Sequence, residues 1–294
     1  MDRLLPCLAL VCLAWGGAAL TWAAEPAGSA AALYVQYAML QSELERSAFE
    51  RPLHLASREA PGEMSGDVHA ILAHPFSSVE GSLQGDQRWC DILLLHLNIK
   101  ACRVAGASQQ SVLSVYIGKK FDEPPREAHK VDFVYRVASL ASDYFRLSLD
   151  ADTGPFGTRD YQIIVEAVPL AEGRTFIHLA YAYRYGPAAK LAMQAYLRTV
   201  GAQKVGFTAD GKRADGRPAF VNGMRGALER NVMRYYLAIE AYLAALGAPP
   251  EQQLDERLKD WFDATERYAQ QLHELDEDAY LEMKRRECAS PAPE

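Results

Sequence analysis

The chain has 294 residues, of which 49% are hydrophobic and 23% charged, and its formal net charge is −7. This composition is typical of a globular protein, and the length suits one large domain or a domain with an appendage. Basic and acidic residues are mixed along the sequence, so the surface offers no basic patch for phosphates, and we exclude a nucleic-acid partner.

The first segment has the order of an export signal: a basic residue, an apolar run and then small residues. Arg3 precedes the apolar run Leu4–Trp22, and Thr21 and Ala23 lie at the −3 and −1 positions of the expected cut. We predict that residues 1–23 are a signal peptide cleaved after Ala23 and that the protein is periplasmic or secreted. The run approaches the ~20 residues of a membrane span, so an uncleaved anchor is the alternative. No second long apolar stretch follows, and we expect no stable membrane insertion after signal removal.

The next part of the chain predicts a helix, a strand and a helix pair. Residues 24–65 are predicted to form an N-terminal tail and a lead-in helix, which the apolar spacing in Leu33–Phe49 indicates. Asp67–His74 alternates between two faces and predicts a strand. Pro75 ends the strand, and two short helices follow, the second of which carries Trp89.

A long middle segment then alternates with a period of two, which is typical of strands that are buried on one face. The turn-like separators are short, so neighbouring strands are expected to pair antiparallel. A helix over residues 188–199 follows Pro187. The predicted strands are Leu97–Ala105, Ser111–Lys119, Lys130–Ala138, Ser142–Asp150, Arg159–Pro169 and Gly173–Tyr185.

The predicted order is a strand, two short helices, six antiparallel strands and a helix. Together with Pro75-Phe76 and Trp89, this order resembles the START-like, helix-grip (polyketide-cyclase-like, SRPBCC) superfamily over residues 66–201. The resemblance implies an α+β fold in which a curved antiparallel sheet wraps a long C-terminal helix. It also implies a hydrophobic ligand cavity between them, since such proteins typically bind lipids, sterols, polyketides or aromatic compounds. The superfamily has no universal catalytic motif, so no functional residue is carried over.

The chain continues beyond that pattern with two helical stretches. Pro218–Leu246 and Leu254–Leu275 each carry an apolar stripe, and the Gly247–Pro250 segment separates them. We predict an antiparallel α-helical hairpin within residues 218–288 that packs on the helix-grip domain. Self-association through this hairpin is the second option, so a homodimer is possible.

Cys90 and Cys102 are twelve positions apart, and in an oxidising compartment they are predicted to form a disulfide. Two buried thiols are the alternative. Cys288 is left over, and either a free thiol or a cross-link is compatible with its position. No His or Cys cluster has metal-ligand spacing, and no glycine-rich loop has phosphate-binding spacing, so we expect no metal and no cofactor.

Tyr181, Tyr183 and Tyr185 share one face of the last predicted strand, and Phe133 and Tyr135 extend the same kind of wall. Phenols in a sheet that lines a cavity combine apolar area with polar tips, which suits an amphipathic ligand. The alternative is that this face packs on the C-terminal helices.

Other polar residues invite weaker functional hypotheses. His178 is expected to face away from the tyrosines, whereas His96 or Tyr183 would be an acid or base in a cavity. Arg225 and Arg234 belong to a solvated helix face, or they clamp an anionic head group or an interface carboxylate.

We predict an exported protein that binds or carries a hydrophobic or amphipathic, lipid-like small molecule, rather than an enzyme. A cyclase or hydratase that uses the same cavity is one alternative. An envelope interaction protein that acts through its C-terminal hairpin is the other.

Overall fold

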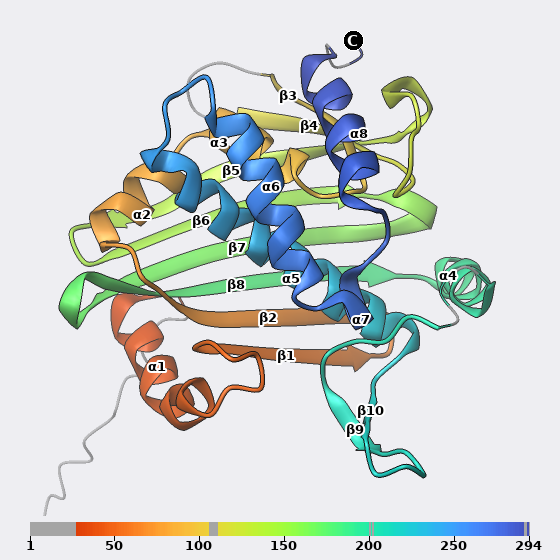
Figure 1. Ribbon diagram of the computed structural model, residues 1–294, viewed down its shortest axis with the longest axis horizontal. Coiled ribbons are helices and arrows are strands. Elements are labelled where there is room, and N and C mark those ends of the chain that lie inside the picture. Colours follow the sequence, from red (N-terminus) through yellow and green to blue (C-terminus); the bar gives the residue numbers. More distant parts are fainter. Residues whose placement is uncertain (1–27, 106–110, 200, 202, 291–292, 294) are drawn as a thin grey trace, which may run out of the picture.

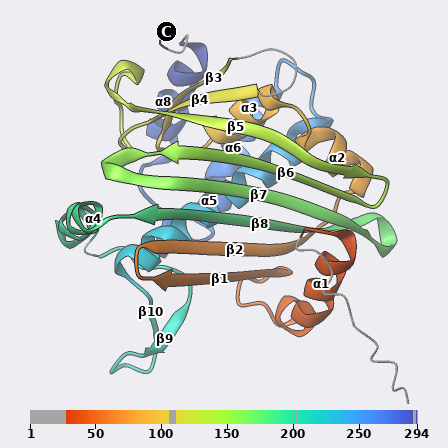
Figure 2. The same ribbon diagram turned by 180° about the vertical axis from the view of Figure 1, so that it is seen from behind.

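A computed structural model describes residues 28–105, 111–199, 201, 203–290 and 293. The predicted signal peptide, residues 1–23, lies outside the described residues. One large sheet forms the body of the molecule, with helices α3, α5, α6 and α8 on one side of it (Figure 1) and α1 at one end of the opposite face (Figure 2).

The large sheet has eight antiparallel strands in the order β1-β2-β8-β7-β6-β5-β4-β3. The six predicted strands of the meander form within a few residues of their expected bounds, because alternating side chains leave one face to bury. An additional strand, β1, precedes the predicted ones. It forms a hairpin with β2 through Pro61 and Gly62, and the φ of 77° at Gly62 suits glycine. The strands are β1 (Leu53–Ala60), β2 (Glu63–Leu72), β3 (Ile99–Ala105), β4 (Ser111–Ile117), β5 (His129–Ala141), β6 (Tyr144–Thr153), β7 (Thr158–Leu170) and β8 (Arg174–Tyr185).

The helices and a two-stranded ribbon complete the α+β architecture. Between α4 and α5, the chain forms the two-stranded ribbon of β9 and β10. The bounds are α1 (Ala30–Glu45), α2 (Phe76–Leu83), α3 (Asp86–Leu94), α4 (Pro187–Thr199), β9 (Ala209–Lys212), β10 (Pro218–Phe220), α5 (Gly223–Ala244), α6 (Gln253–Glu266), α7 (Ala269–Leu272) and α8 (Glu277–Ala289).

The helix that the sheet wraps is α5, and not the expected helix over residues 188–199. α5 packs on β1, β2 and β8 of the sheet and on α3 and α6, and most of its side chains are buried. α4 lies beyond the end of β8, and its Leu191 is 70% exposed. α5 has 22 residues against 13 in α4, and 15 residues of α5 are buried. The longer helix carries more apolar side chains in total, so it removes more apolar surface from water when the sheet encloses it.

The remaining C-terminal helices also pack within the chain. Trp261 of α6 is buried and donates its indole N–H to the Arg234 carbonyl of α5 at 3.1 Å. Tyr280 of α8 is buried and donates to the Leu95 carbonyl at 2.9 Å. The second expected helix of the hairpin, Leu254–Leu275, is divided into α6 and α7, and a further helix, α8, follows it. No helix of the described part of the chain is both long and apolar enough to cross a membrane.

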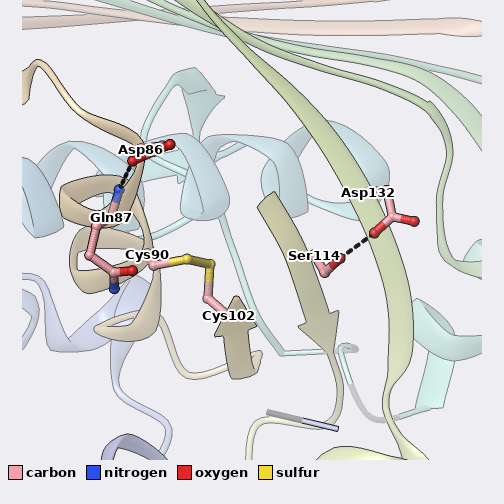
Figure 3. Close-up of a disulfide and its surroundings, with 6 residues drawn as sticks. All are labelled: Asp86, Gln87, Cys90, Cys102, Ser114 and Asp132. Carbon is pink, nitrogen blue, oxygen red and sulfur yellow. Dashed lines mark hydrogen bonds between the residues drawn. A yellow bond between two sulfur atoms is a disulfide. The ribbon is translucent and has the colours of Figure 1, made fainter. Parts of the chain in front are cut away.

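The predicted disulfide is present and joins α3 to β3. The Cα atoms of Cys90 and Cys102 are 5.3 Å apart (Figure 3). Cys90 is fully buried, and Cys102 packs against the main core. The bridge therefore fastens the short helix pair to the edge strand of the sheet. Cys288 is a free thiol, and burial raises its pKa.

Candidate ligand-binding site

Tyr181, Tyr183 and Tyr185 lie on the face of β8 that α5 covers, and each is about 5% exposed or less. Two further tyrosines join the first two. The ring of Tyr161 from β7 stacks 5.3 Å from Tyr183, and the ring of Tyr235 from α5 lies 5.6 Å from Tyr181. We call Tyr161, Tyr181, Tyr183 and Tyr235 the tyrosine cluster.

The other predicted ligand-binding residues, Phe133, Tyr135 and Tyr185, are not members of the tyrosine cluster. Phe133 borders it, with its ring 6.4 Å from that of Tyr161. The hydroxyl of Tyr135 accepts a hydrogen bond from the Gly85 backbone N–H at 2.9 Å. The hydroxyl of Tyr185 donates to the Ala60 carbonyl at 3.3 Å. Tyr135 and Tyr185 therefore connect structural elements.

The hydroxyls of the tyrosine cluster are sparsely satisfied. Tyr161 shares a hydrogen bond with Thr158 at 2.7 Å, whereas the hydroxyls of Tyr181, Tyr183 and Tyr235 form none within the described part of the chain. Burial raises the pKa of all three phenols, so they remain neutral and can both donate and accept. These three hydroxyls are therefore available to water or to a polar group of a ligand.

Sequence reasoning missed Tyr161 and Tyr235 as members of this cluster. The alternation of β7 carries a signal for Tyr161, because it has the same parity as the buried Ile163 and Val165. Tyr235 belongs to the apolar stripe of α5, but only the position of α5 under the sheet brings it to Tyr181.

His96 adjoins the tyrosine cluster. Its ring stacks on Tyr235 at 4.9 Å, and its Nδ1 accepts a hydrogen bond from the Asn98 backbone N–H at 3.1 Å. Burial, and then the charges of Arg234 and Lys120, hold the pKa of His96 well below its usual value. The imidazole is therefore neutral with its proton on Nε2, which is buried and has no hydrogen-bond partner.

An open cleft of about 1000 Å³ lies at the edge of the sheet, where the end of β2 meets α5, α6 and the segment before β1. We call it the edge cleft. Small and apolar side chains line much of it, and Phe49 and Tyr268 add an aromatic surface with ring centroids 5.9 Å apart. The smaller apolar lining residues are Ala48, Pro52, Ile71, Leu72, Ala73, Ala241, Ala244 and Ala264.

Charged groups border the edge cleft. Arg51 forms an ion pair with Glu240, which also accepts a hydrogen bond from the Tyr236 hydroxyl at 2.6 Å. Asp260 and Asp263 of α6 have no ion pair among the described residues. Burial, and then neighbouring carboxylates, raise the pKa of Asp260. The edge cleft thus combines apolar area with charged side chains, which also include Glu50 and Arg267. This lining is more polar than that of most small-molecule sites, and it suits an amphipathic ligand. None of its residues was predicted, because they come from four distant segments.

The opposite face of the sheet carries a separate buried network under α1. His178 bridges two carboxylates: its Nδ1 lies 2.9 Å from Glu166 and its Nε2 lies 2.9 Å from Asp67. Burial opposes the charge of His178, but the two carboxylates outweigh burial and raise its pKa to about 9. Arg146 and Tyr144 also bind Glu166, at 3.0 and 2.6 Å. His178 therefore faces away from the tyrosines, as its position in the strand predicts.

The two arginines singled out in α5 have structural partners. Arg234 donates to Glu274 at 3.0 Å, so it binds an interface carboxylate between α5 and the segment after α7. Arg225 donates to the Ser57 hydroxyl of β1 at 2.7 Å. No group of three His, Cys, Asp or Glu side chains within the described residues could hold a metal ion.

Comparisons with known proteins concern the fold. No protein-family model and no curated protein match this chain. Similar solved structures include Ara h 8.0201, at 9% identity and a TM-score of 0.33, with 66% of this chain and 99% of that chain covered. Human StAR-related lipid transfer protein 5 is 11% identical, with 55% and 87% covered and a TM-score of 0.29. A conserved protein from Geobacillus kaustophilus is 15% identical, with 47% and 85% covered and a TM-score of 0.32. In this chain itself, the eight-stranded antiparallel sheet and the enclosed helix α5 form an α+β fold.

Proposed function

We propose that the protein binds and carries an amphipathic small molecule and that the edge cleft holds it. The observation that carries this proposal is the volume of the cleft, about 1000 Å³, because small-molecule sites range from about 300 to 1,000 Å³. The apolar and aromatic lining suits the body of such a ligand, and the charged groups suit a polar end. The cleft opens to solvent, so a ligand enters it without displacing α5.

The experiment fills the edge cleft and leaves the rest of the fold in place. Ala244 is exposed within the cleft, so Ala244→Trp adds an indole there without burying it in the core. Ala192→Trp places the same side chain on the exposed surface of α4 and serves as the matched control. Binding of 8-anilinonaphthalene-1-sulfonate, an aromatic amphiphile, is measured by fluorescence titration of purified protein with its disulfide formed.

We expect saturable binding to the unaltered protein and to the Ala192→Trp variant, and binding at least about tenfold weaker for Ala244→Trp. Equal affinity in all three proteins would place the ligand elsewhere. Lipid extraction and mass spectrometry of protein from its own host then identify the natural ligand. An extract without any bound small molecule, together with no probe binding, would overturn the proposed function.

The tyrosine cluster is the second candidate location, which the three unpartnered hydroxyls favour. A Tyr181→Phe substitution removes one hydroxyl and keeps the ring, and Tyr185→Phe is its control because Tyr185 already has a partner. If the ligand contacts the cluster, Tyr181→Phe weakens binding and Tyr185→Phe does not. If water alone satisfies the hydroxyls, both variants bind the probe as the unaltered protein does.

We also propose that the protein works in the periplasm or outside the cell. The leader pattern of residues 1–23 supports this, and so does the Cys90–Cys102 disulfide, since such bonds persist in oxidising compartments. Fractionation of the host and N-terminal sequencing test it. A first residue of Ala24 in the periplasmic or secreted fraction is expected, whereas an uncleaved chain in the membrane fraction supports the anchor. A cytoplasmic protein would contradict both.

A further inference from the structure

A group of positive side chains gathers where α5, the segment after β4 and the segment after α7 meet. Lys120, Lys204 and Arg234 all bind the carboxylate of Glu274, at 2.5, 3.5 and 3.0 Å. We call these four residues the basic junction. Glu274 is the one carboxylate within ion-pair distance of Lys120 or Lys204 in the described part of the chain. The Glu274 carboxylate therefore binds three positively charged side chains.

Two of these cations can reach a ligand from solvent. The side chains of Lys120 and Lys204 are 22% and 28% exposed, whereas Arg234 is 1% exposed. The Lys120 ammonium has three donors, and among the described residues Glu274 is its one acceptor. Lys204 donates to the His273 carbonyl and keeps donors as well. Free donors of two neighbouring lysines thus remain at the surface of the basic junction.

The electrostatics of the basic junction favour a further negative charge. Burial, and then the charge of Arg234, lower the pKa of Lys120 to about 8, even though Glu274 acts in the opposite direction. The charges of Lys120 and Arg234 lower the pKa of Glu274 enough to outweigh its burial. An anion beside Lys120 would relieve the repulsion between the cations, so its binding free energy includes that relief.

His96 supplies a second, independent sign of a missing partner. Its Nε2–H is buried without a hydrogen-bond acceptor, and the charges that act on it most strongly belong to Arg234 and Lys120. A buried donor that lacks an acceptor costs about 1–3 kcal/mol, and native proteins seldom leave one. The neutral imidazole thus lacks an acceptor for its Nε2–H, and Lys120 and Lys204 keep free donors at the basic junction.

We propose that the basic junction is a second binding site, separate from the edge cleft, for an anionic oxygen group such as a carboxylate or phosphate. Lys120 and Lys204 contact the anion, while Arg234 and Glu274 hold the two lysines together. Two sources share this chemistry: a free inorganic anion, or the head group of an amphiphile whose apolar part lies against the neighbouring tyrosines.

Isothermal titration of the full chain with inorganic phosphate and, separately, with decanoate tests the proposal. Lys120→Met removes a contacting cation, and Lys259→Met removes an exposed lysine of α6 as the matched control. Lys120→Arg keeps the charge. We expect saturable binding of at least one probe, loss of about tenfold or more in affinity for Lys120→Met, and near-normal affinity for the other two variants.

The outcomes separate the sources. Comparable binding of both probes indicates a free-anion site, and binding of decanoate alone indicates a head-group site. A downfield shift of the His96 Nε2–H proton on binding would show that the imidazole takes part. No saturable binding of either probe, or the same affinity in Lys120→Met and Lys259→Met, would overturn the proposal. Ala244→Trp should leave this binding unchanged, so the edge cleft and the basic junction can fail independently.

Discussion

Substituting His178 by glutamine is predicted to remove a pH-dependent part of the protein's stability. His178 lies between the carboxylates of Glu166 and Asp67 on the outer face of the sheet, and its side chain is 10% exposed. His69, whose pKa is lowered to about 3 chiefly by burial and then by the charge of His178, stacks on it as a neutral ring at 4.2 Å. The folded protein therefore holds a proton on His178 that the unfolded chain releases near pH 6.5.

The sign and the size of the effect follow from these pKa values. A pKa raised from 6.5 to about 9 corresponds to about 3 kcal/mol of stability that is complete below pH 6.5 and lost as the pH rises through 9. Glu166 acts in the opposite direction. Its pKa is lowered to about 2, because hydrogen bonds with His178 and Tyr144 outweigh burial, so its contribution is complete above pH 4.5 and lost as the pH falls toward 2. The two values describe one contact and are not added.

The assay is urea unfolding of the unaltered protein and of His178→Gln at fixed pH values between 5 and 10, with the disulfide intact. The difference in unfolding free energy between the two proteins should shrink by about 3 kcal/mol from pH 6 to pH 10. His129→Gln changes an exposed histidine and should show no such dependence. A constant difference for His178→Gln across this range, or an NMR titration of His178 with a midpoint near 6.5, would refute the reasoning.

Three further predictions concern the fold and are each tested by unfolding measurements. Replacing both Cys90 and Cys102 by serine should lower stability by about 3 kcal/mol, as a short closed loop predicts, and reduction of the unaltered protein should have the same effect. Gly206→Ala should destabilise, because an added Cβ would lie 2.5 Å from a carboxylate oxygen of Glu229, whereas Gly81→Ala in open space should be neutral or stabilising. A chain that ends after α4 should lack a cooperative transition in circular dichroism, because the enclosed face of the sheet loses α5; a folded truncation would contradict the role assigned to α5.

Several features of the fold follow from local patterns. The segments that form β3 to β8 alternate apolar and polar side chains. Successive side chains of a strand point to opposite faces, so this alternation indicates that one face is buried in a core. The same rule assigned Tyr181 and His178 to opposite faces, which the structure confirms. The disulfide was predictable because the two cysteines are only twelve positions apart, in α3 and in the strand β3 that follows it.

The binding features depended on contacts that no local pattern contains. The edge cleft combines residues 48–52, 71–74, 240–244 and 260–268, and the basic junction joins Lys120 to Glu274 across 154 positions. The sequence offered His96 only as a weak candidate for an acid or base. Its contact with Tyr235 and the effect of Arg234 on its pKa both depend on the position of α5.

The sequence by itself determined the strands β2 to β8, the helices α1 to α4 and the start of α5 and α6, because backbone geometry imposes a period on each element. It also favoured the pairing of Cys90 with Cys102. Only the tertiary structure decided which helix the sheet encloses. Helices α4 and α5 both present apolar side chains, and the choice between them depends on the total apolar surface that each removes from water. That choice in turn places Tyr235, Arg234 and the floor of the edge cleft, so the candidate sites are consequences of packing and not of any motif.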